Sequence, residues 1–428
     1  MLAHPTLASA LSLEPHLAWI RTQFPALAQT WRGEPIAFLD GPGGTQVPQT
    51  VIDAISHYLV QANANAHGAF ATSQKTDQVI AHAHAAIADL LGCDRDEVIF
   101  GPNMTTLTFA LSRAIGRQLQ PGDEIVVTRL DHDANVAPWR ALAERGAIVK
   151  TVDIHPEDCT LDEADLAQKL SCRTRLVAVT AASNAVGTMP DVSAIAQMAH
   201  AVGAWVFVDA VHYATHAPID VKAWDCDFLA CSPYKFYGPH LGVIYGKREH
   251  LARLRPYKVR PAPDRIPACW ETGTQNHEGL AGLIAAVDYI AALGRRLAPL
   301  ATSRRAQLIT AMTAMHRYGQ QLCQRLIQGL QTMPGITLYG ITDPQRLDQR
   351  VGTIALRQGD RAPADIAQFL AQRGIFVWHG NFYALGLTKR LGLEDTGGFV
   401  RIGLVHYNTA AEGDRLLSAL RRYSRWRR

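Results

Sequence analysis

Short apolar runs recur along the chain up to residue 246, and they define the expected sheet. Most of these runs are rich in Val and Ile and stay apolar throughout: 96–100, 123–128, 148–154, 175–181, 204–210, 228–231 and 242–246. Continuous apolar strands are typical of a parallel sheet that is buried on both faces. Segments with helical periodicity, such as 105–119 and 192–203, lie between most of them. The pattern predicts an α/β domain in which helices cover a mostly parallel sheet.

The pattern changes after residue 275. Two long helical segments, 276–293 and 304–330, come first. Shorter strands and helices follow: strand 335–340, strand 351–358, helix 362–374, strands 375–379 and 399–404, and helix 409–424. This order predicts a smaller C-terminal α+β domain. We therefore expect an N-terminal segment, 1–36, that packs on the small domain or the active site, a large domain, 37–275, and interdomain helices with the small domain, 276–428.

Composition excludes several classes of protein. The chain has 428 residues, of which 48% are hydrophobic and 19% charged, and a formal net charge of +4, which is a globular composition. Without a basic stripe interleaved with aromatics, we expect no nucleic-acid partner. The sequence has no apolar run of about 20 residues, so we expect no membrane span. The seven cysteines form no C-x-x-C pair, and the N-terminus lacks a signal-peptide pattern. We expect a reducing, cytoplasmic location and no metal site.

One lysine stands out in the stretch "FLACSPYKFYGPHLGVIYG", residues 228–246. Lys235 lies in the turn between two apolar strands, among aromatic and small residues and without a neighbouring acid. An amine crowded by apolar surface has a lowered pKa and is a better nucleophile.

Other polar residues follow the remaining strands, where ligands bind in sheets of this kind. Thr105 and Thr106 open a helix after 96–100, and a helix start with free N–H groups suits a phosphate, although a plain N-cap explains it as well. Ser232, ahead of Lys235, is suited to a second phosphate contact.

A histidine, an amide and a carboxylate complete the set. His132 and Asn184 each follow a strand, and each also fits an ordinary structural or turn residue. Asp209 ends an apolar strand, where a carboxylate is costly unless a cation answers it. Pyridoxal phosphate (PLP) needs such a combination, because a lysine forms its Schiff base and an acid keeps its ring nitrogen protonated.

The sequence resembles the class V aminotransferase family, of PLP fold type I, and within it the cysteine desulfurase and selenocysteine lyase group. The motifs "VDAVH", "SPYKFYGP", "ETGTQN" and "VRIGLVHYNT" occur in family order, and the similarity runs from residue 37 to residue 420. The resemblance implies a PLP-dependent lyase or transferase that acts on an amino acid as a homodimer.

It also implies residue roles. Lys235 would hold PLP, His132 would stack on its ring, and Asp209 would pair with the ring nitrogen. Asn184 would lie near the ring oxygen or the substrate carboxylate. The phosphate would be held by Thr105 and Ser232, and by Thr274 from the partner subunit. Arg401 would bind the substrate α-carboxylate through its planar fork.

Some positions near the expected cofactor depart from the family pattern. His212 stands where desulfurases usually have Gln facing the ring oxygen, and Tyr234 stands where His usually precedes the lysine. Met104 takes the place of the first of two threonines among the expected cofactor contacts.

The mobile loop departs most. In the stretch "VWHGNFYALGL", Tyr383 occupies the place of the cysteine that takes sulfur as a persulfide, and Trp378 that of an arginine. A phenol cannot carry a persulfide, although it can pass a proton or shape a pocket. Cys269 and Cys231 lie nearest to the site motifs, and we interpret both as small buried hydrophobes.

These residues favour a C–S (or other β-substituent) lyase without the usual loop cysteine. An aminotransferase or epimerase of class V remains an alternative, because fold does not choose among reactions. A non-catalytic PLP-fold binding protein is disfavoured, since the expected reactive residues are all present. A nucleotide-dependent oxidoreductase is excluded, because "DGPGGTQ" does not fit the G-x-G-x-x-G spacing. The sequence identifies neither the substrate side chain nor a sulfur-acceptor protein.

Overall fold

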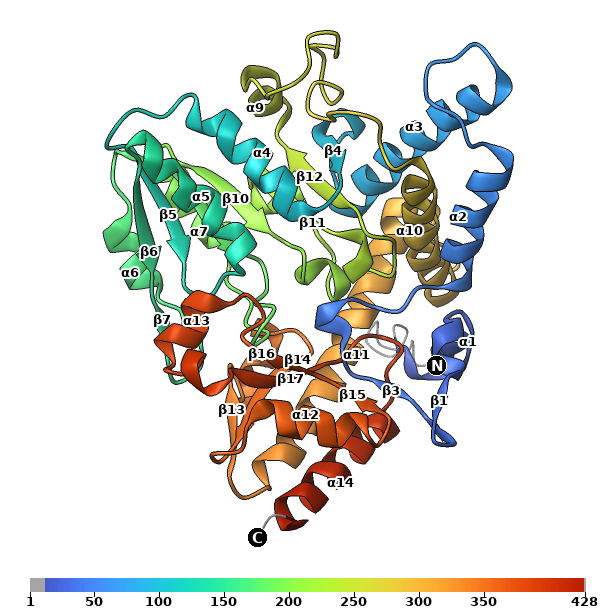
Figure 1. Ribbon diagram of the computed structural model, residues 1–428, viewed down its shortest axis with the longest axis vertical. Coiled ribbons are helices and arrows are strands. Elements are labelled where there is room, and N and C mark those ends of the chain that lie inside the picture. The colour runs from blue at the N-terminus through green and yellow to red at the C-terminus, as the bar shows by residue number, and fades with distance from the viewer. Residues whose placement is uncertain (1–11, 427–428) are drawn as a thin grey trace, which may run out of the picture.

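The computed structural model describes residues 12–426 and is built around a twisted seven-stranded sheet, visible in Figure 1. The strand order is β4-β12-β11-β10-β9-β5-β6. The strands are β4 (Val98–Gly101), β5 (Glu124–Thr128), β6 (Ile148–Val152), β9 (Thr174–Thr180), β10 (Trp205–Asp209), β11 (Phe228–Cys231) and β12 (Gly242–Gly246). β12 is antiparallel to both of its neighbours, whereas β11, β10, β9, β5 and β6 pair in parallel. The predicted mostly parallel α/β sheet is confirmed.

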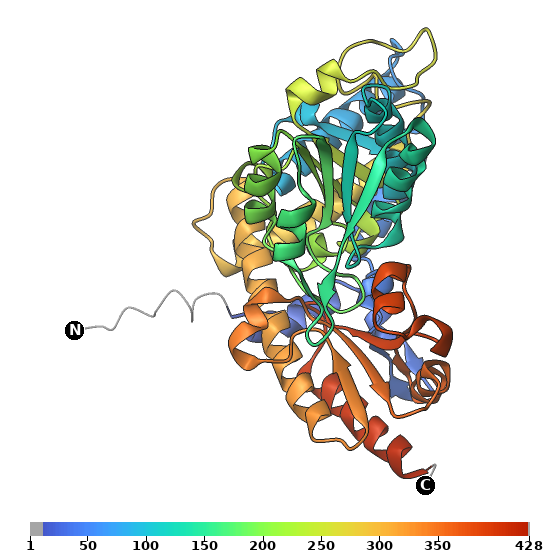
Figure 2. The same cartoon turned by 90° about the vertical axis from the view of Figure 1, so that its left-hand side faces the viewer.

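Two separate cores explain why the strands are apolar without alternation. Val126 and Val206 belong to a core on one face, whereas Ile125 and Phe207 belong to a core on the other. Successive side chains of a strand point to opposite faces, so both faces need apolar residues. In Figure 2 helices cover both faces of the sheet. The helices of this part are α2 (Gln49–Gln61), α3 (Ala71–Leu91), α4 (Met104–Gly116), α5 (Ala137–Arg140), α6 (Glu163–Lys169), α7 (Val192–Ala201), α8 (Val221–Trp224) and α9 (Arg248–Arg253).

The C-terminal part is the predicted α+β unit. Its antiparallel sheet has the order β13-β14-β17-β16. These strands are β13 (Ile336–Tyr339), β14 (Thr353–Gln358), β16 (Trp378–Gly380) and β17 (Phe399–Gly403). The helices are α10 (His277–Leu297), α11 (Arg304–Gln331), α12 (Pro363–Ala371), α13 (Leu385–Arg390) and α14 (Ala410–Trp426). None of the helices within residues 12–426 is long and apolar enough to cross a membrane.

The strand predicted at 375–379 is in fact two strands. β15 (Ile375–Phe376) pairs in parallel with β3 (Ala37–Phe38), whereas β16 joins the antiparallel sheet. The first half of the apolar run pairs with β3 and the second half with β17, so the run does not form one continuous strand.

The N-terminal segment lies beside the C-terminal part. α1 (Leu17–Thr22) precedes the short strands β1 (Thr30–Trp31) and β2 (Glu34–Pro35), and β3 follows. In Figure 1 this segment lies below the large sheet, and β3 is close to β15. Residues 1–11 of the predicted segment 1–36 lie outside the described residues. The domain limits at 37 and 276 stay predictions; the β3–β15 pair links residues 37–38 to the C-terminal part.

Candidate active site

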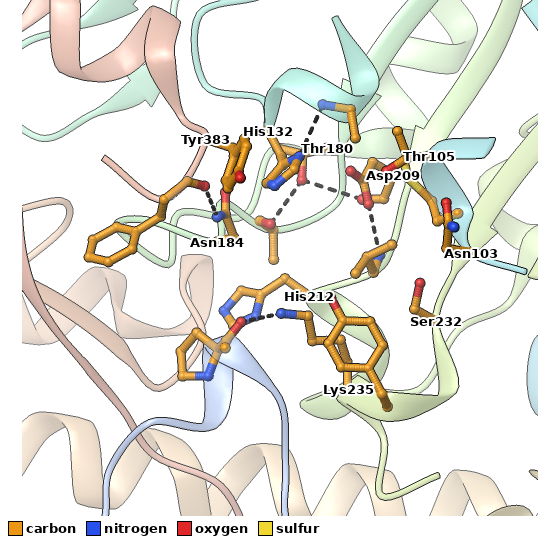
Figure 3. Close-up of a pocket in the computed structure, with 18 of the residues that line it drawn as sticks. Asn103, Thr105, His132, Thr180, Asn184, Asp209, His212, Ser232, Lys235 and Tyr383 are labelled. Carbon is orange, nitrogen blue, oxygen red and sulfur yellow. Dashed lines mark hydrogen bonds between the residues drawn. The ribbon is translucent and has the colours of Figure 1, made fainter. Parts of the chain in front are cut away.

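A cavity of about 330 Å³ opens where the parallel strands end and the C-terminal sheet approaches them. This volume is within the usual range for small-molecule sites, roughly 300–1,000 Å³. Figure 3 shows the labelled side chains converging on one space from several segments. The predicted site residues that line it are Met104, Thr105, His132, Asn184, Asp209, His212, Ser232, Lys235, Tyr383 and Arg401. Distant parts of the sequence are thus brought together.

Lys235 lies at the bottom of this cavity. The turn after β11 presents it with a relative exposure of 8%, and its Nζ donates to the carbonyl oxygen of Pro42. Its ammonium group also lies 4.8 Å from the ring centroid of Tyr234. Burial lowers the pKa of Lys235 to about 7, helped by the charge of Arg401 and opposed by that of Asp209. A large share of the amine is therefore unprotonated and nucleophilic near neutral pH.

Asp209 ends β10 and is buried beside the lysine. Its Oδ1 accepts a hydrogen bond of 2.9 Å from the backbone N–H of Val211. Burial raises the pKa of Asp209 to about 6, while that hydrogen bond and the Lys235 charge lower it. The carboxylate is mostly ionised at pH 7 and can pair with a cationic ring nitrogen.

His132 faces the cavity as a neutral ring. Its Nδ1 accepts a hydrogen bond of 3.0 Å from the N–H of Ala134. Burial lowers the pKa of His132 to about 4, and the charges of Lys235 and Arg401 lower it further. The neighbouring Asp131 is fully buried and accepts hydrogen bonds from Thr128 and Asn135. This network fixes the start of the segment that carries the ring.

Three buried polar atoms at the cavity lack a partner among residues 12–426: Asn184 Oδ1, His212 Nδ1 and Arg401 Nε. The rest of each group is engaged. Asn184 Nδ2 donates to the Phe382 carbonyl at 2.9 Å, and Arg401 Nη1 donates to the Asn184 carbonyl at 2.9 Å. Buried polar atoms without partners are rare, so these three are suited to receive a polar ligand.

The start of α4 is suited to bind an anion. Asn103 caps this helix by accepting a hydrogen bond of 2.8 Å from the Thr106 N–H. A helix start leaves N–H groups free and attracts negative charge. Thr105 and Ser232 line the same end of the cavity. A Cβ on Gly242 would come within 2.3 Å of the Asn103 backbone, so this glycine lets β12 approach the helix start.

Tyr383 lies at the mouth of the cavity. Its ring stacks on His132, with centroids 5.3 Å apart and planes 26° from parallel. The side chain is 71% exposed. Phe382 and Tyr383 both adopt left-handed backbone conformations, with φ of 56° and 58°. Such strain persists only where the surroundings hold it, and it clusters at functional sites.

Thr274 lies outside this cavity. It lines a second hollow with His84 and Glu271, near the start of α10. The structure therefore does not place it with the other predicted cofactor contacts of its own chain.

Sequence reasoning missed several groups. It did not single out the Pro42 carbonyl, Gly43, Thr180 or Phe382, which also line the cavity. The Arg401 guanidinium lies over the Phe382 ring, 3.9 Å from the ring centroid. The glycine-rich turn "DGPGG" at 40–44 is a local signal for such a contact, because glycines let the backbone approach a ligand closely.

Comparison with known proteins defines the class. A family model described as aminotransferase class-V matches residues 37–416. The chain therefore belongs to the class V aminotransferase family, and it is a PLP-dependent enzyme. Within that family it is cysteine desulfurase-like, as the sequence motifs predicted.

Two relatives support the assignment to the cysteine desulfurase-like group. The cysteine desulfurase of Pectobacterium atrosepticum is 33% identical over 422 residues, which cover 95% of this chain and 97% of that protein. The cysteine desulfurase of Dickeya dadantii is 32% identical over 423 residues, covering 95% and 96%.

Solved structures agree. The cysteine desulfurase CsdA (S-sulfonic acid) from Escherichia coli has a TM-score of 0.82 and 27% identity, covering 96% of this chain and 98% of that one. The apo cysteine desulfurase from Thermococcus onnurineus NA1 has a TM-score of 0.84 at 24% identity, covering 99% and 100%, and supports the fold.

The cavity fits the cofactor that the family implies. It combines a buried amine, a buried carboxylate, a neutral imidazole and a helix start that is suited to an anion. The unpartnered atoms of Asn184 and His212 add polar contacts at the centre. No group of His, Cys, Asp and Glu within residues 12–426 is arranged to hold a metal ion.

Proposed function

We propose that this chain is a PLP-dependent C–S lyase. It would bind an amino acid with sulfur on Cβ and release that sulfur as free sulfide or thiol. One observation carries the proposal. The loop that brings a cysteine to the substrate in desulfurases brings Tyr383 here, and no cysteine within residues 12–426 lines the cavity.

The remaining cysteines support this view. Cys231 and Cys269 are buried with exposures of 0% and 5%, and burial raises the pKa of both thiols. A buried thiol with a raised pKa supplies little thiolate to attack sulfur. A relocated persulfide at either position is therefore disfavoured.

The cofactor-facing residues have separate tasks. PLP, when bound, withdraws electrons from the substrate Cα and so weakens the bonds at that atom. Lys235 is proposed as the attachment point and as the group that moves the proton at Cα, since a pKa of about 7 suits proton exchange near neutral pH. Asp209 would hold a proton on the ring nitrogen, and His132 would stack on the ring. Thr105 and Ser232 would hold the phosphate.

Substrate binding is assigned to Arg401 and Asn184. The guanidinium is held by the Asn184 carbonyl and by the Phe382 ring, and its Nε has no partner within residues 12–426. A planar donor fixed in this way suits a carboxylate, because two parallel hydrogen bonds form at once. The substrate would then lie with Cα near Lys235 and its side chain toward Tyr383.

Tyr383 is proposed to shape the mouth of the site. Its ring stacks on His132, and its side chain is 71% exposed. This placement favours packing over proton transfer.

The decisive experiment is a panel of amino acids that includes cysteine and S-substituted cysteines. We expect equal amounts of pyruvate and sulfide or thiol, without a reductant, because elimination leaves no sulfur on the protein. Alanine together with a protein persulfide would instead indicate a desulfurase. A 2-oxo acid without sulfur release would indicate an aminotransferase, and racemised substrate an epimerase. A shift in the visible spectrum without any product would favour the binding protein.

Cofactor attachment is tested separately. Borohydride should fix a pyridoxyl group on Lys235, as located by peptide mass spectrometry. Lys235→Ala should abolish this label and still bind PLP reversibly. A label on another lysine would refute the assignment.

We also propose a homodimer in the cytoplasm. Thr274 lies away from its own cavity, which is expected if it contacts the phosphate of the partner subunit. α2 exposes apolar side chains at Ile52, Leu59 and Val60, a pattern that suits a subunit contact. All cysteines are free, as expected for a reducing compartment.

A further inference from the structure

His212 joins the two parts of the molecule through one hydrogen bond. It follows β10 of the large sheet, and its Nε2 lies 2.7 Å from the hydroxyl oxygen of Thr353, the first residue of β14. Both side chains are buried, with exposures of 3% for His212 and 0% for Thr353. His212 also lines the cavity. Its other ring nitrogen, Nδ1, has no hydrogen-bond partner within residues 12–426.

The ring of His212 is neutral. Burial lowers its pKa well below the ordinary value, and the charges of His216, Lys235 and Arg401 act in the same direction. The His216 ring stands edge-on to it, with centroids 4.8 Å apart. A neutral imidazole carries one N–H, so the ring must be protonated on Nε2 or on Nδ1.

The Thr353 hydroxyl decides between these two forms. It has no other hydrogen-bond partner in the part of the chain that the structure describes. If Nε2 carried the hydrogen and donated it, the threonine hydrogen would be buried without an acceptor, which is costly. If the hydroxyl donates to Nε2, the hydroxyl hydrogen and the Nε2 lone pair are both satisfied, and only the group at Nδ1 is left for a ligand. The hydrogen of the ring then lies on Nδ1.

We propose that Thr353 is a positioning residue that fixes the tautomer of His212, so that Nδ1–H is a donor to the ring oxygen of the cofactor. This inference rests on the proposed function, because it assigns PLP as the acceptor. A glutamine, which is usual at this position in desulfurases, has an N–H in any state. A neutral histidine has one on the required side in only one of its two tautomers, and a hydrogen bond donated to its other nitrogen selects that tautomer.

The expected effect is spectroscopic. A donated hydrogen bond stabilises negative charge on the ring oxygen and lowers the proton affinity of the lysine-bound cofactor. Thr353→Val keeps the shape and removes the donor, so the tautomer is no longer fixed. We expect the pH midpoint of the visible absorbance change to rise by roughly one to two units, as for the loss of a hydrogen bond to a charged group.

Matched variants separate this effect from packing. Thr353→Ser keeps the hydroxyl and should titrate like the wild type. In a His212→Gln background, Thr353→Val should not shift the midpoint, because the amide donor needs no tautomer. Thr353→Ala repeats the test if valine is not accommodated.

Two results would overturn the inference. One is an unchanged midpoint in both Thr353→Val and Thr353→Ala while PLP remains bound. The other is an equal shift in the His212→Gln background, which would assign the effect to packing. If the purified wild type does not bind PLP at all, the proposed function itself is refuted. The Nδ1–H of His212 then has no cofactor oxygen to donate to, and the role of Thr353 is refuted with it.

Discussion

At the scale of single residues, Lys235 has an unusual character because of what surrounds it. The sequence showed only that its neighbours are apolar, whereas the folded chain buries the amine and places Arg401 nearby, and both lower its pKa to about 7. An exposed lysine titrates near pH 10.4. The difference moves the nucleophilic form of the amine into the physiological range.

This pKa predicts how PLP attaches to the apoprotein. Because only the neutral amine reacts, the attachment rate should fall about tenfold for each pH unit below 7 and level off above about pH 8. Rapid-mixing absorbance at fixed PLP measures it, with free Nα-acetyl-lysine as the control. A rate that continues to climb up to pH 10 would mean that Lys235 is an ordinary lysine.

At the scale of elements, the loop after β16 is held in place by the large domain. The Asp133 N–H donates to the Tyr383 carbonyl at 2.8 Å, and Asn184 holds the carbonyl of Phe382. Asn381 Oδ1 accepts from the Tyr383 N–H at 3.1 Å. These bonds support two successive left-handed residues and aim the tyrosine ring at His132.

We expect Tyr383→Phe to keep turnover within about threefold, because the stacked ring remains, and Tyr383→Ala to lose about tenfold or more, as expected for a misplaced site group. Steady-state kinetics on the best substrate measures both. Tyr257→Phe, at an exposed tyrosine outside the cavity, is the control. A large loss in Tyr383→Phe alone would assign the hydroxyl a role in proton transfer.

Asp227, just before β11, holds several elements together. Its carboxylate pairs with His200 at 2.9 Å, His250 at 2.8 Å and Lys247 at 3.1 Å, and it accepts from the Val206 N–H at 2.8 Å. Against the penalty of burial, these hydrogen bonds and charges lower the pKa of Asp227 to about 2. The group therefore ties α7, α9 and β10 to the strand that leads to Lys235.

Asp227→Asn should lower the free energy of unfolding at pH 7 by roughly 3 kcal/mol, because it removes the buried carboxylate that Lys247 faces and that the His200 and His250 rings hydrogen-bond. A depressed folded pKa gives stability above the unfolded pKa of about 4, and this stability is lost as the pH falls from 4 toward 2. The free energies of unfolding of the wild type and of Asp227→Asn, measured in urea, should therefore become equal as the pH falls from 4 to 2. Asp264→Asn is the control, since Asp264 is 97% exposed. If the two free energies of unfolding differ by the same amount down to pH 2, the carboxylate of Asp227 is not stabilised by these partners.

At the scale of the whole molecule, the proposed dimer makes each site depend on two chains. Thr274→Ala should then weaken PLP retention, although Thr274 does not line its own cavity. Sedimentation measures the assembly, and PLP release into a scavenger measures retention. Thr272→Ala, at an exposed neighbour, is the control. A fully active monomer would exclude a cross-subunit role.

The sequence by itself determined the large sheet and most of the site. Continuous apolar strands predicted a sheet buried on both faces, and residues at the strand ends, such as Asp209 and Lys235, had to meet because parallel strands end at one edge. These signals are local, since each needs only a strand and the residue after it. The same local reading assigned one strand to 375–379, where the chain forms two.

Only the tertiary structure decided the contacts between distant segments. The Pro42 carbonyl reaches Lys235 across 193 positions, and Thr353 reaches His212 across 141. Thr353 has no local pattern that marks it, and the glycine-rich turn around Pro42 does not point to Lys235, because a hydroxyl or a carbonyl gains a role only from what folds against it. The pKa values of Lys235, Asp209 and His132 follow the same rule. Burial is their largest cause, and burial is a property of the packed chain rather than of its sequence neighbours.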